Sequence, residues 1–150
     1  MAGLDFWCRK LKIVYLQNNL IEVMEGISKC KELEYLNLAV NNISLIQGVK
    51  GCESLQKLDF TLNFIDIEDL EESIDNLSEC KDIRELYFVG NPLTDWPHWQ
   101  DYIIARIPTL SRLDGTDITK SMRMAALQKF DMMQKDLVFA SRKRIEEKVL

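Results

Sequence analysis

The chain has 150 residues, of which 47% are hydrophobic and 29% are charged. This length and balance predict one soluble globular domain. No apolar run approaches the roughly 18–20 residues that cross a bilayer, and the first ten residues lack the basic start and apolar block of a signal peptide. We therefore expect no membrane partner.

The net charge of −5 is unevenly distributed along the chain. Residues 1–118 contain 11 basic and 20 acidic residues, a net charge of −9, whereas residues 119–150 contain 8 and 4, a net charge of +4. An acidic body repels a phosphate backbone, and the basic tail is too mixed in sign to indicate nucleic acid. We therefore expect no nucleic-acid partner.

One apolar pattern occurs four times. In Leu33–Ile43 (LEYLNLAVNNI) the first, fourth, sixth and eleventh residues are apolar and the ninth is asparagine, which is the pattern of a leucine-rich repeat. Successive copies begin 22, 22 and 28 residues apart, and an incomplete fifth begins 27 residues later. The copies are Leu11–Ile21, Leu33–Ile43, Leu55–Ile65, Ile83–Leu93 and the incomplete Leu110–Leu113.

These repeats predict an α/β fold, a leucine-rich-repeat solenoid with a curved parallel sheet on its concave face and short 3-10 or α turns on its convex face. The repeat domain with its C-terminal cap is expected over residues 1–118, and a long C-terminal helix over 119–150. Residues 4–10 resemble the end of a repeat without its beginning, so we expect an upstream part to be missing. The alternative is an improvised cap from Leu4, Phe6 and Trp7. The repeats are expected near residues 11–32, 33–54, 55–82 and 83–109.

Each copy centres on a five-residue strand such as Tyr35–Ala39, in which Leu36 and Leu38 face the core and the alternate residues face outward. After the strand the chain turns while still inside the stack, where its backbone groups need partners. An asparagine amide both donates and accepts hydrogen bonds. We therefore predict a structural ladder of four asparagines: Asn19, Asn41, Asn63 and Asn91.

Four cysteines occupy one repeat position, three residues before the next copy begins. The functional alternative is a metal or disulfide set. The spacings of 22, 22 and 28 residues match no zinc pattern, and a free cysteine behaves as a small buried hydrophobe. We predict reduced core thiols, no metal site and a cytosolic environment. The four are Cys8, Cys30, Cys52 and Cys80.

The third coil contains an acidic insertion, Asp66–Asp75, whose apolar residues recur every three or four positions. This spacing predicts a helix on the convex side with its acids in solvent. A calcium site is the alternative, but the EF-hand pattern and its glycine are absent.

The segment that follows the fourth copy predicts a helical cap. A helix is expected over Asp95–Ile107, with Thr94 or Asp95 as its N-cap, Pro97 in its first turn and His98 on the surface. A closing strand and turn should then follow at Leu110–Gly115. From residue 119 onward the spacing predicts one long helix, whose end beyond residue 140 needs a partner in order to form.

The sequence offers no catalytic chemistry. It contains neither a G-x-x-x-x-G-K-[ST] nor a G-x-G-x-x-G phosphate loop, and its single histidine leaves little room for a nucleophile pair. We therefore predict a non-enzymatic protein without a cofactor. The concave face is the candidate protein-binding surface, because tyrosines are enriched at interface hot spots; the alternative is an ordinary solvated sheet face. The candidate contact residues are Tyr15, Tyr35, Asn37, Asp59 and Tyr87.

The phrases LKIVYLQNNLI and LEYLNLAVNNI and the closure IPTLSRLDGTDI, followed by Arg123, Ala126 and Leu127, resemble the leucine-rich-repeat dynein axonemal assembly factors, the touch-insensitive-larva-B family. The wider repeat class includes the protein phosphatase 1 regulatory repeat protein and the spliceosomal U2 A-prime protein. The likeness runs from about Trp7 to Leu127. It implies a factor that preassembles dynein arms in the cytoplasm of ciliated or flagellated cells, with dynein chains and chaperone-type assembly factors as partners.

Two other functions remain open. The phrase FVGNPL at Phe88–Leu93 is similar to one in the leucine-rich-repeat light chain of outer-arm dynein, which would make the chain an axonemal subunit of the cilium or flagellum. A phosphatase regulatory subunit would instead bind its catalytic subunit through the concave face. The chain is expected to be monomeric on its own.

Overall fold

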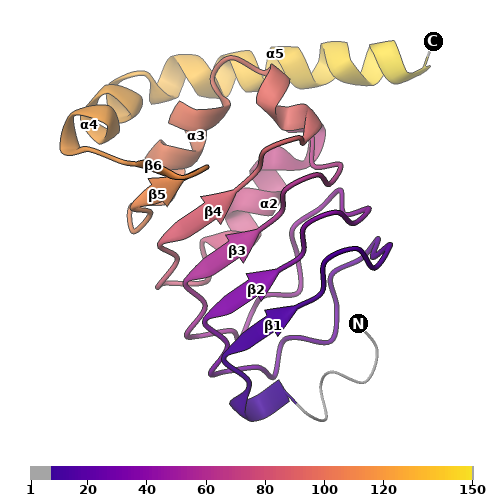
Figure 1. Cartoon of the computed structure of the whole chain (residues 1–150). Helices are drawn as coiled ribbons and strands as arrows, with labels where there is room; N and C mark the ends of the chain where they lie inside the picture. The colour runs from indigo at the N-terminus through magenta and orange to yellow at the C-terminus, as the bar shows by residue number, and fades with distance from the viewer. Residues whose placement is uncertain (1–7, 150) are drawn as a thin grey trace.

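A computed structural model describes residues 8–149, apart from the side chain of Cys8. The chain winds through successive coils, and each coil adds one short strand to a single sheet (Figure 1). The expectations that concern Leu4, Phe6 and Trp7 lie outside the described residues. The strands are β1 (Ile13–Tyr15), β2 (Tyr35–Asn37), β3 (Lys57–Asp59), β4 (Glu85–Tyr87), β5 (Arg112–Leu113) and β6 (Thr116–Asp117).

The sheet follows chain order from β1 to β6, with parallel pairing from β1 to β5 and antiparallel pairing of β5 with β6. Leu36 pairs with Val14 on one side and with Leu58 on the other, so equivalent repeat positions lie in register. The residues that alternate with these apolar positions face away from the core. This architecture confirms the predicted leucine-rich-repeat solenoid.

The strands are shorter than the five residues predicted for each: β2 and β3, for example, have three residues. The hydrogen-bonded ladder nevertheless continues past the end of each strand. The amides of Leu38 and Val40 donate to the carbonyls of Asp59 and Thr61, both over 2.8 Å. The coils therefore stay joined through the turn that leaves the sheet.

Three asparagines lie inside the stack at the end of a strand: Asn41, Asn63 and Asn91. The Asn63 Oδ1 accepts from the Ile43 amide over 3.0 Å, and its Nδ2 donates to the carbonyls of Leu38 and Phe60 over 2.8 and 3.0 Å. Each of these side chains thus joins its own coil to the one before it. Asn19 differs: it is exposed, and among the described residues its side-chain Nδ2 donates only to the Gln17 carbonyl.

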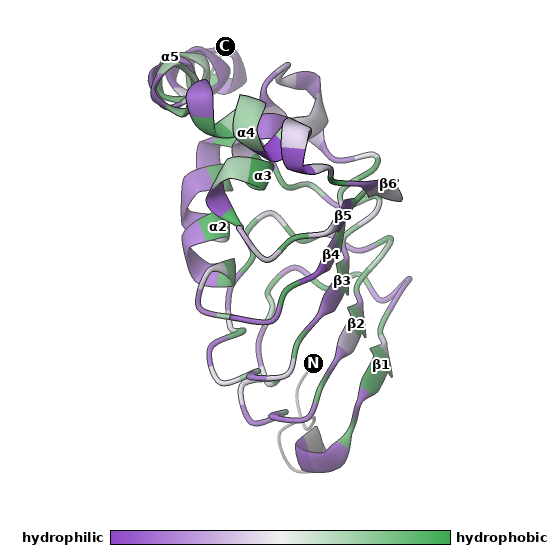
Figure 2. Ribbon diagram, turned by 90° about the vertical axis from the view of Figure 1, so that its left-hand side faces the viewer, coloured by the Kyte–Doolittle hydropathy of each residue, from purple (hydrophilic) through white to green (hydrophobic). Residues whose placement is uncertain are grey.

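The convex side changes character along the solenoid (Figure 2). In the second coil it consists of single turns, such as the one closed by the 3.0 Å bond from the Cys52 amide to the Val49 carbonyl. In the third coil the acidic insertion forms the 3-10 turn η2 (Ile67–Asp69) and the helix α2 (Leu70–Leu77). Ile67, Leu70, Ile74 and Leu77 are buried, which confirms the predicted convex-side helix.

The cap begins with the 3-10 turn η3 (Pro92–Asp95) and continues as α3 (Trp99–Arg106). The prediction that this helix starts at Thr94 or Asp95 is wrong, because the Thr94 hydroxyl instead donates to the Asn91 carbonyl and closes η3. Trp99 packs edge-on against Phe88, with 6.3 Å between ring centroids. The cap therefore closes the end of the stack with aromatic rings.

After the cap the chain forms β5, within the predicted closing strand and turn, and pairs it with β6, which was not predicted. Two helices follow, α4 (Lys120–Gln128) and α5 (Phe130–Val149). The prediction of one continuous helix is wrong, because the chain breaks at Lys129. The ring of Phe130 stacks on Tyr102 of α3, with 6.1 Å between centroids. Arg123 of α4 donates to the carbonyls of three cap residues, which ties the first helix to the end of α3. The carbonyls belong to Ile104, Ile107 and Leu110.

The cysteines divide into two groups. Cys52 and Cys80 are buried free thiols, as predicted. Cys30 is equally buried but is disulfide-bonded, so the prediction of a reduced thiol is wrong there. Burial favours both the neutral thiol and the disulfide over the thiolate, and sequence spacing alone does not distinguish the two.

Burial raises the pKa of the Cys52 thiol to about 11 and that of the Cys80 thiol to about 12. At pH 8 both are therefore neutral and poor nucleophiles. We expect iodoacetamide to alkylate them about 100-fold more slowly in the native chain than in urea, where a cysteine has its ordinary pKa of about 8.5. Mass spectrometry of timed aliquots measures both rates. Equal rates in the two conditions would contradict this burial.

Candidate protein-binding surface

The sheet register brings the outward side chains of successive coils together on the concave face. One column runs through Ile13, Tyr35, Lys57 and Glu85, and the next through Tyr15, Asn37, Asp59 and Tyr87. Tyr15 and Tyr35 lie in neighbouring columns, with 5.6 Å between their ring centroids. Four of the candidate contact residues thus share the second column, and Tyr35 lies in the first.

Lys57 lies at the centre of this surface, although nothing in the sequence singled it out. Its Nζ is 4.5 Å from the centroid of the Tyr35 ring and 5.4 Å from that of Tyr87. It is also 3.5 Å from Glu85 Oε2. A cation over two aromatic faces holds both rings in place. We call Tyr15, Tyr35, Lys57, Glu85 and Tyr87 the concave cluster.

Tyr87 donates its hydroxyl hydrogen to Glu85, and this bond, with smaller contributions from burial and from the Glu85 charge, raises the pKa of Tyr87 to about 12. The phenol is therefore neutral throughout the physiological range. Glu85 consequently holds Tyr87 on one side and Lys57 on the other. The cluster therefore presents two oriented tyrosine rings to a partner. The charges of Lys57 and Glu85 within it are already paired with each other.

The other two predicted contact residues, Asn37 and Asp59, also bond to their own coils. The Asn37 Oδ1 accepts from the Ala39 amide over 3.0 Å, and the Asp59 Oδ1 accepts from the Thr61 amide over 2.9 Å. The Asn37 Nδ2 donates to the Tyr35 hydroxyl over 3.2 Å. Both side chains therefore stabilise the turn that follows their strand, and Asn37 also orients Tyr35.

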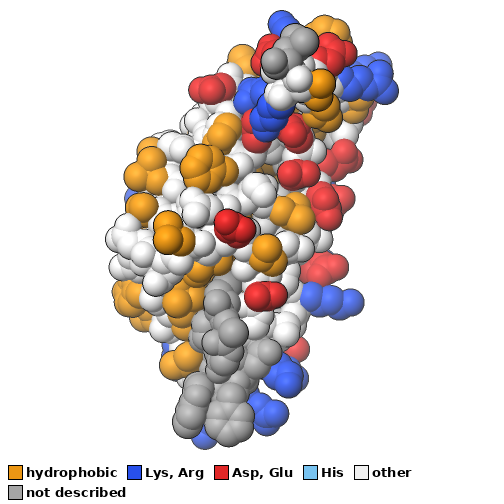
Figure 3. Space-filling view, turned by 90° about the vertical axis from the view of Figure 1, so that its right-hand side faces the viewer, with side chains coloured by type: hydrophobic (Ala, Val, Ile, Leu, Met, Phe, Trp, Pro, Cys, Tyr) orange, Lys and Arg blue, Asp and Glu red, His pale blue; other side chains and the backbone are white. Residues whose placement is uncertain are grey.

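Hydrophobic and charged side chains occupy different parts of the surface. Figure 3 shows hydrophobic side chains gathered on the half of the molecule nearer the sheet, with acidic and basic side chains along the opposite, convex edge. Tyr15 and Ile13 on β1 are 61% and 52% exposed. An apolar surface of this kind suits a protein contact better than a small polar ligand.

Within residues 8–149 no group of three or more His, Cys, Asp or Glu side chains converges as a metal site would require. None of the helices described there combines the length and apolar character needed to cross a bilayer. His98 is half-buried beside Trp96, and its Nε2 is 4.0 Å from Asp136 Oδ2.

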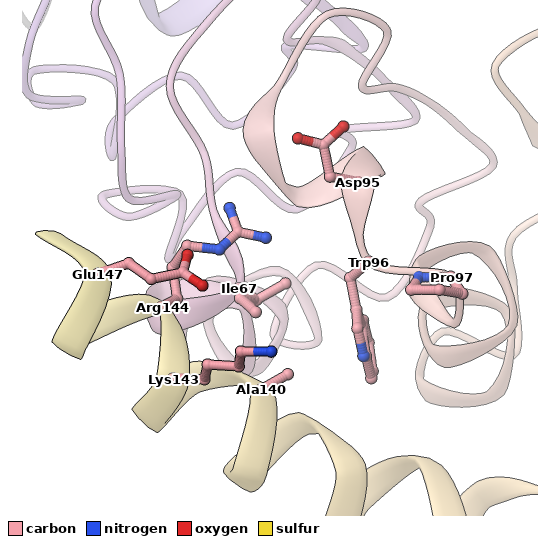
Figure 4. A pocket seen from close by; sticks show the side chains of 8 residues that line it. All are labelled: Ile67, Asp95, Trp96, Pro97, Ala140, Lys143, Arg144 and Glu147. Atoms are coloured by element: carbon pink, nitrogen blue, oxygen red, sulfur yellow. The ribbon is translucent and has the colours of Figure 1, made fainter.

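A second polar site joins α5 to the convex side, and the sequence did not indicate it. The Asp66 side chain is only 7% exposed, and the Arg144 Nη1 donates to both of its oxygens over 2.9 Å. Lys148 lies 3.3 Å from Asp66 and also pairs with Glu68. A hollow of ≈ 230 Å³ lies beside this site. Figure 4 shows Arg144 and Lys143 of α5 on one side of it and Trp96 and Asp95 on the other.

The expectation that the acids of the insertion lie in solvent is therefore wrong for Asp66. The expectation that the end of α5 needs a partner also differs from the structure, because the partner is the chain's own η2. The Trp96 Nε1 donates to Asp136 over 2.7 Å and fixes the middle of the same helix. The C-terminal helix is thus fastened at two points.

No protein-family model matches the chain. Among curated proteins, it is 54% identical over 131 residues to dynein axonemal assembly factor 11 of Xenopus tropicalis and 48% identical over 134 residues to the human protein of that name. It is 45% identical over 143 residues to protein tilB of Drosophila melanogaster. The chain is a homologue of the dynein axonemal assembly factor 11 and tilB proteins. These matches cover 87%, 89% and 95% of the chain.

The chain spans only 27%, 28% and 35% of the lengths of these assembly factor 11 and tilB proteins. Among solved structures, it matches one from the crystal structure of the Drosophila melanogaster SNF/U2A′ complex with a TM-score of 0.63 and 21% identity, over 88% of this chain and 76% of that one. That likeness concerns the fold alone. It agrees with the repeat architecture described above.

Proposed function

We propose that the chain is the leucine-rich-repeat part of a factor that assembles axonemal dynein, and that it acts as a non-enzymatic scaffold binding other proteins. The observation that carries this proposal is the 44–55% identity to several proteins named for that role. The division into a repeat domain over residues 1–118 and a helix over 119–150 remains part of the proposal. Assembly would take place in the cytoplasm of ciliated or flagellated cells.

The concave cluster supports a binding role for the sheet face. It combines three tyrosine rings with one lysine and one glutamate whose charges already balance (the pair Lys57–Glu85). A partner therefore gains contact with rigid rings without burying an unpaired charge. Unassembled dynein chains and chaperone-type assembly factors are the partners we expect there.

The proposed test is affinity purification with mass spectrometry on the tagged full-length protein from flagellated cells, with cytoplasm and axoneme separated. Cytoplasmic recovery of chaperones with unassembled dynein chains supports the proposal. Stable axonemal recovery with one dynein heavy chain would replace it with a light-chain role. Recovery of a phosphatase catalytic subunit would replace it with a phosphatase-regulatory role.

Changing both Tyr35 and Tyr87 to alanine should lower the amount of partner recovered by about tenfold or more, because tyrosines at interface centres are hot spots. The matched control changes both residues to phenylalanine, which keeps the rings. Circular dichroism checks that the fold survives in each variant. If the alanine variant is folded and retains every partner, the concave face is not the binding site.

A further inference from the structure

The four loops that follow β1 to β4 contain no charged residue, although 29% of the chain is charged. Each loop has five residues: 17–21, 39–43, 61–65 and 89–93. Five hydrophobic side chains in these loops are between 43% and 78% exposed, whereas the last residues of three loops, Ile43, Ile65 and Leu93, are buried. We call the five exposed ones the post-strand strip: Leu20, Val40, Leu62, Phe64 and Val89.

The strip is continuous across the coils. The Val40 amide donates to the Thr61 carbonyl and the Leu62 amide to the Val89 carbonyl, each over 2.8 Å, so these loops are stacked directly on one another. A Cβ atom built on Gly90 would lie 2.5 Å from Leu62 Cδ2, which shows that the Leu62 side chain extends over the next coil. Hydrophobic side chains crowd the same side of the molecule in Figure 3.

Three members of the strip also have an unfavourable left-handed backbone: Val40, Leu62 and Leu20, whose φ angle is 55°. Residues 18, 40, 62 and 90 share one repeat position with a left-handed conformation, and their φ angles are 62°, 56°, 57° and 80°. Asparagine and glycine suit this conformation, and they occupy positions 18 and 90. Val40 and Leu62 tolerate it poorly, since a β-branched or bulky residue is strained there.

Positions 40 and 62 therefore combine exposed apolar surface with backbone strain. Neither feature helps the isolated chain fold, because asparagine would remove both and the chain already uses it at position 18. Strained residues persist where they serve a function. The strip is thus better explained by contact with another molecule than by the stability of this one.

The geometry of the strip fits an α-helix. Coils of a parallel sheet lie about 4.8 Å apart, close to the roughly 5.4 Å pitch of an α-helix. A helix laid across four coils can therefore place about one apolar side chain on each loop over roughly three turns. Acidic side chains border the strip, with Glu22 after the first loop and Asp59 shortly before the third, and residues 1–118 carry a net charge of −9.

We propose that the post-strand strip binds an amphipathic helix of a partner protein, apolar on the face that meets the strip and basic on its flanks. This contact is additional to the concave face and does not depend on it. Both surfaces lie on the sheet side, so one partner can use both. Contacts between the strip and the bound helix would offset the energetic cost of the strained backbone at Val40 and Leu62.

The test pairs a stability measurement with a cross-linking measurement. The variant Val40→Asn/Leu62→Asn should melt at the same temperature as the parent or higher, because asparagine relieves the left-handed strain. A photo-cross-linking amino acid at position 64 of the full-length protein, in flagellated cells, should give adducts whose partner residues recur every three or four positions in one segment. In the double variant this adduct should fall about tenfold or more.

The matched control is Phe139→Gln, which removes an exposed hydrophobic side chain, 69% exposed, from α5. It should leave the adduct at position 64 unchanged. The proposal is overturned if the adducts are scattered, are no more abundant than those from the same cross-linker at position 139, or map to a second copy of this chain. It is also overturned if Val40→Asn/Leu62→Asn leaves the adduct intact. Because Tyr35 and Tyr87 are unchanged in that variant, this failure is distinguishable from failure of the concave site.

Discussion

Asn63→Ala should lower the free energy of unfolding by about 3 kcal/mol. The substitution leaves the buried Ile43 amide without its acceptor. The carbonyls of Leu38 and Phe60 each lose one donor and keep another, from Asn41 and Asn91 respectively. Each unsatisfied buried group costs about 1–3 kcal/mol. Such a loss is a large fraction of the roughly 5–15 kcal/mol that stabilises a typical domain. Urea denaturation followed by circular dichroism measures it.

Asn19→Ala is a control at the same repeat position. Asn19 is exposed, and its side chain donates only to the nearby Gln17 carbonyl among the described residues. We expect its effect to stay within about 0.5 kcal/mol, as for most surface changes. Equal losses of unfolding free energy in Asn19→Ala and Asn63→Ala would show that the hydrogen bonds between coils do not account for the stability that the asparagines provide.

Arg144→Leu should cost about 2–3 kcal/mol and release the end of α5. The change leaves the Asp66 carboxylate, 7% exposed, without the guanidinium that bonds both of its oxygens. Removing one partner of a fully buried pair costs about 3–5 kcal/mol. The expected value is smaller because Lys148 remains within 3.3 Å and Arg144 is itself 22% exposed. Denaturation gives the energy, and amide hydrogen exchange over residues 138–149 reports the helix.

Arg142→Leu provides the comparison, since Arg142 is exposed on the same helix two residues earlier. It should change neither the stability nor the exchange of α5 appreciably. If both variants lose α5 protection equally, the Asp66 contact does not hold the helix. If neither loses it, the bond from Trp96 to Asp136 is sufficient.

The repeat alignment predicted the sheet and most of the candidate site, because both depend on two local regularities. Side chains alternate along a strand, and equal repeat lengths bring equivalent positions into register. These two rules place Tyr35 beside Lys57 and Asn37 beside Asp59. They do not predict how far a long side chain reaches, which is why Lys57 between two tyrosine rings was missed.

Contacts between distant segments were outside the reach of sequence reasoning. Asp66 was expected in solvent with the other acids of its helix, and it is buried because Arg144, 78 residues later, covers it. No proline or glycine near Lys129 predicts the break between α4 and α5. It follows from docking, since Phe130 stacks on Tyr102 immediately after the break.

The sequence by itself determined the solenoid, its register, three of the four ladder asparagines and the tyrosines of the concave face. All of these follow from a periodicity that each repeat carries within about 22 residues. Only the tertiary structure decided the pairing of Asp66, the division of the C-terminal helix and the state of Cys30. These three features depend on which surfaces remain exposed once the coils have stacked. Burial of those surfaces determines the cost of an unpaired charge and the packing of the cap.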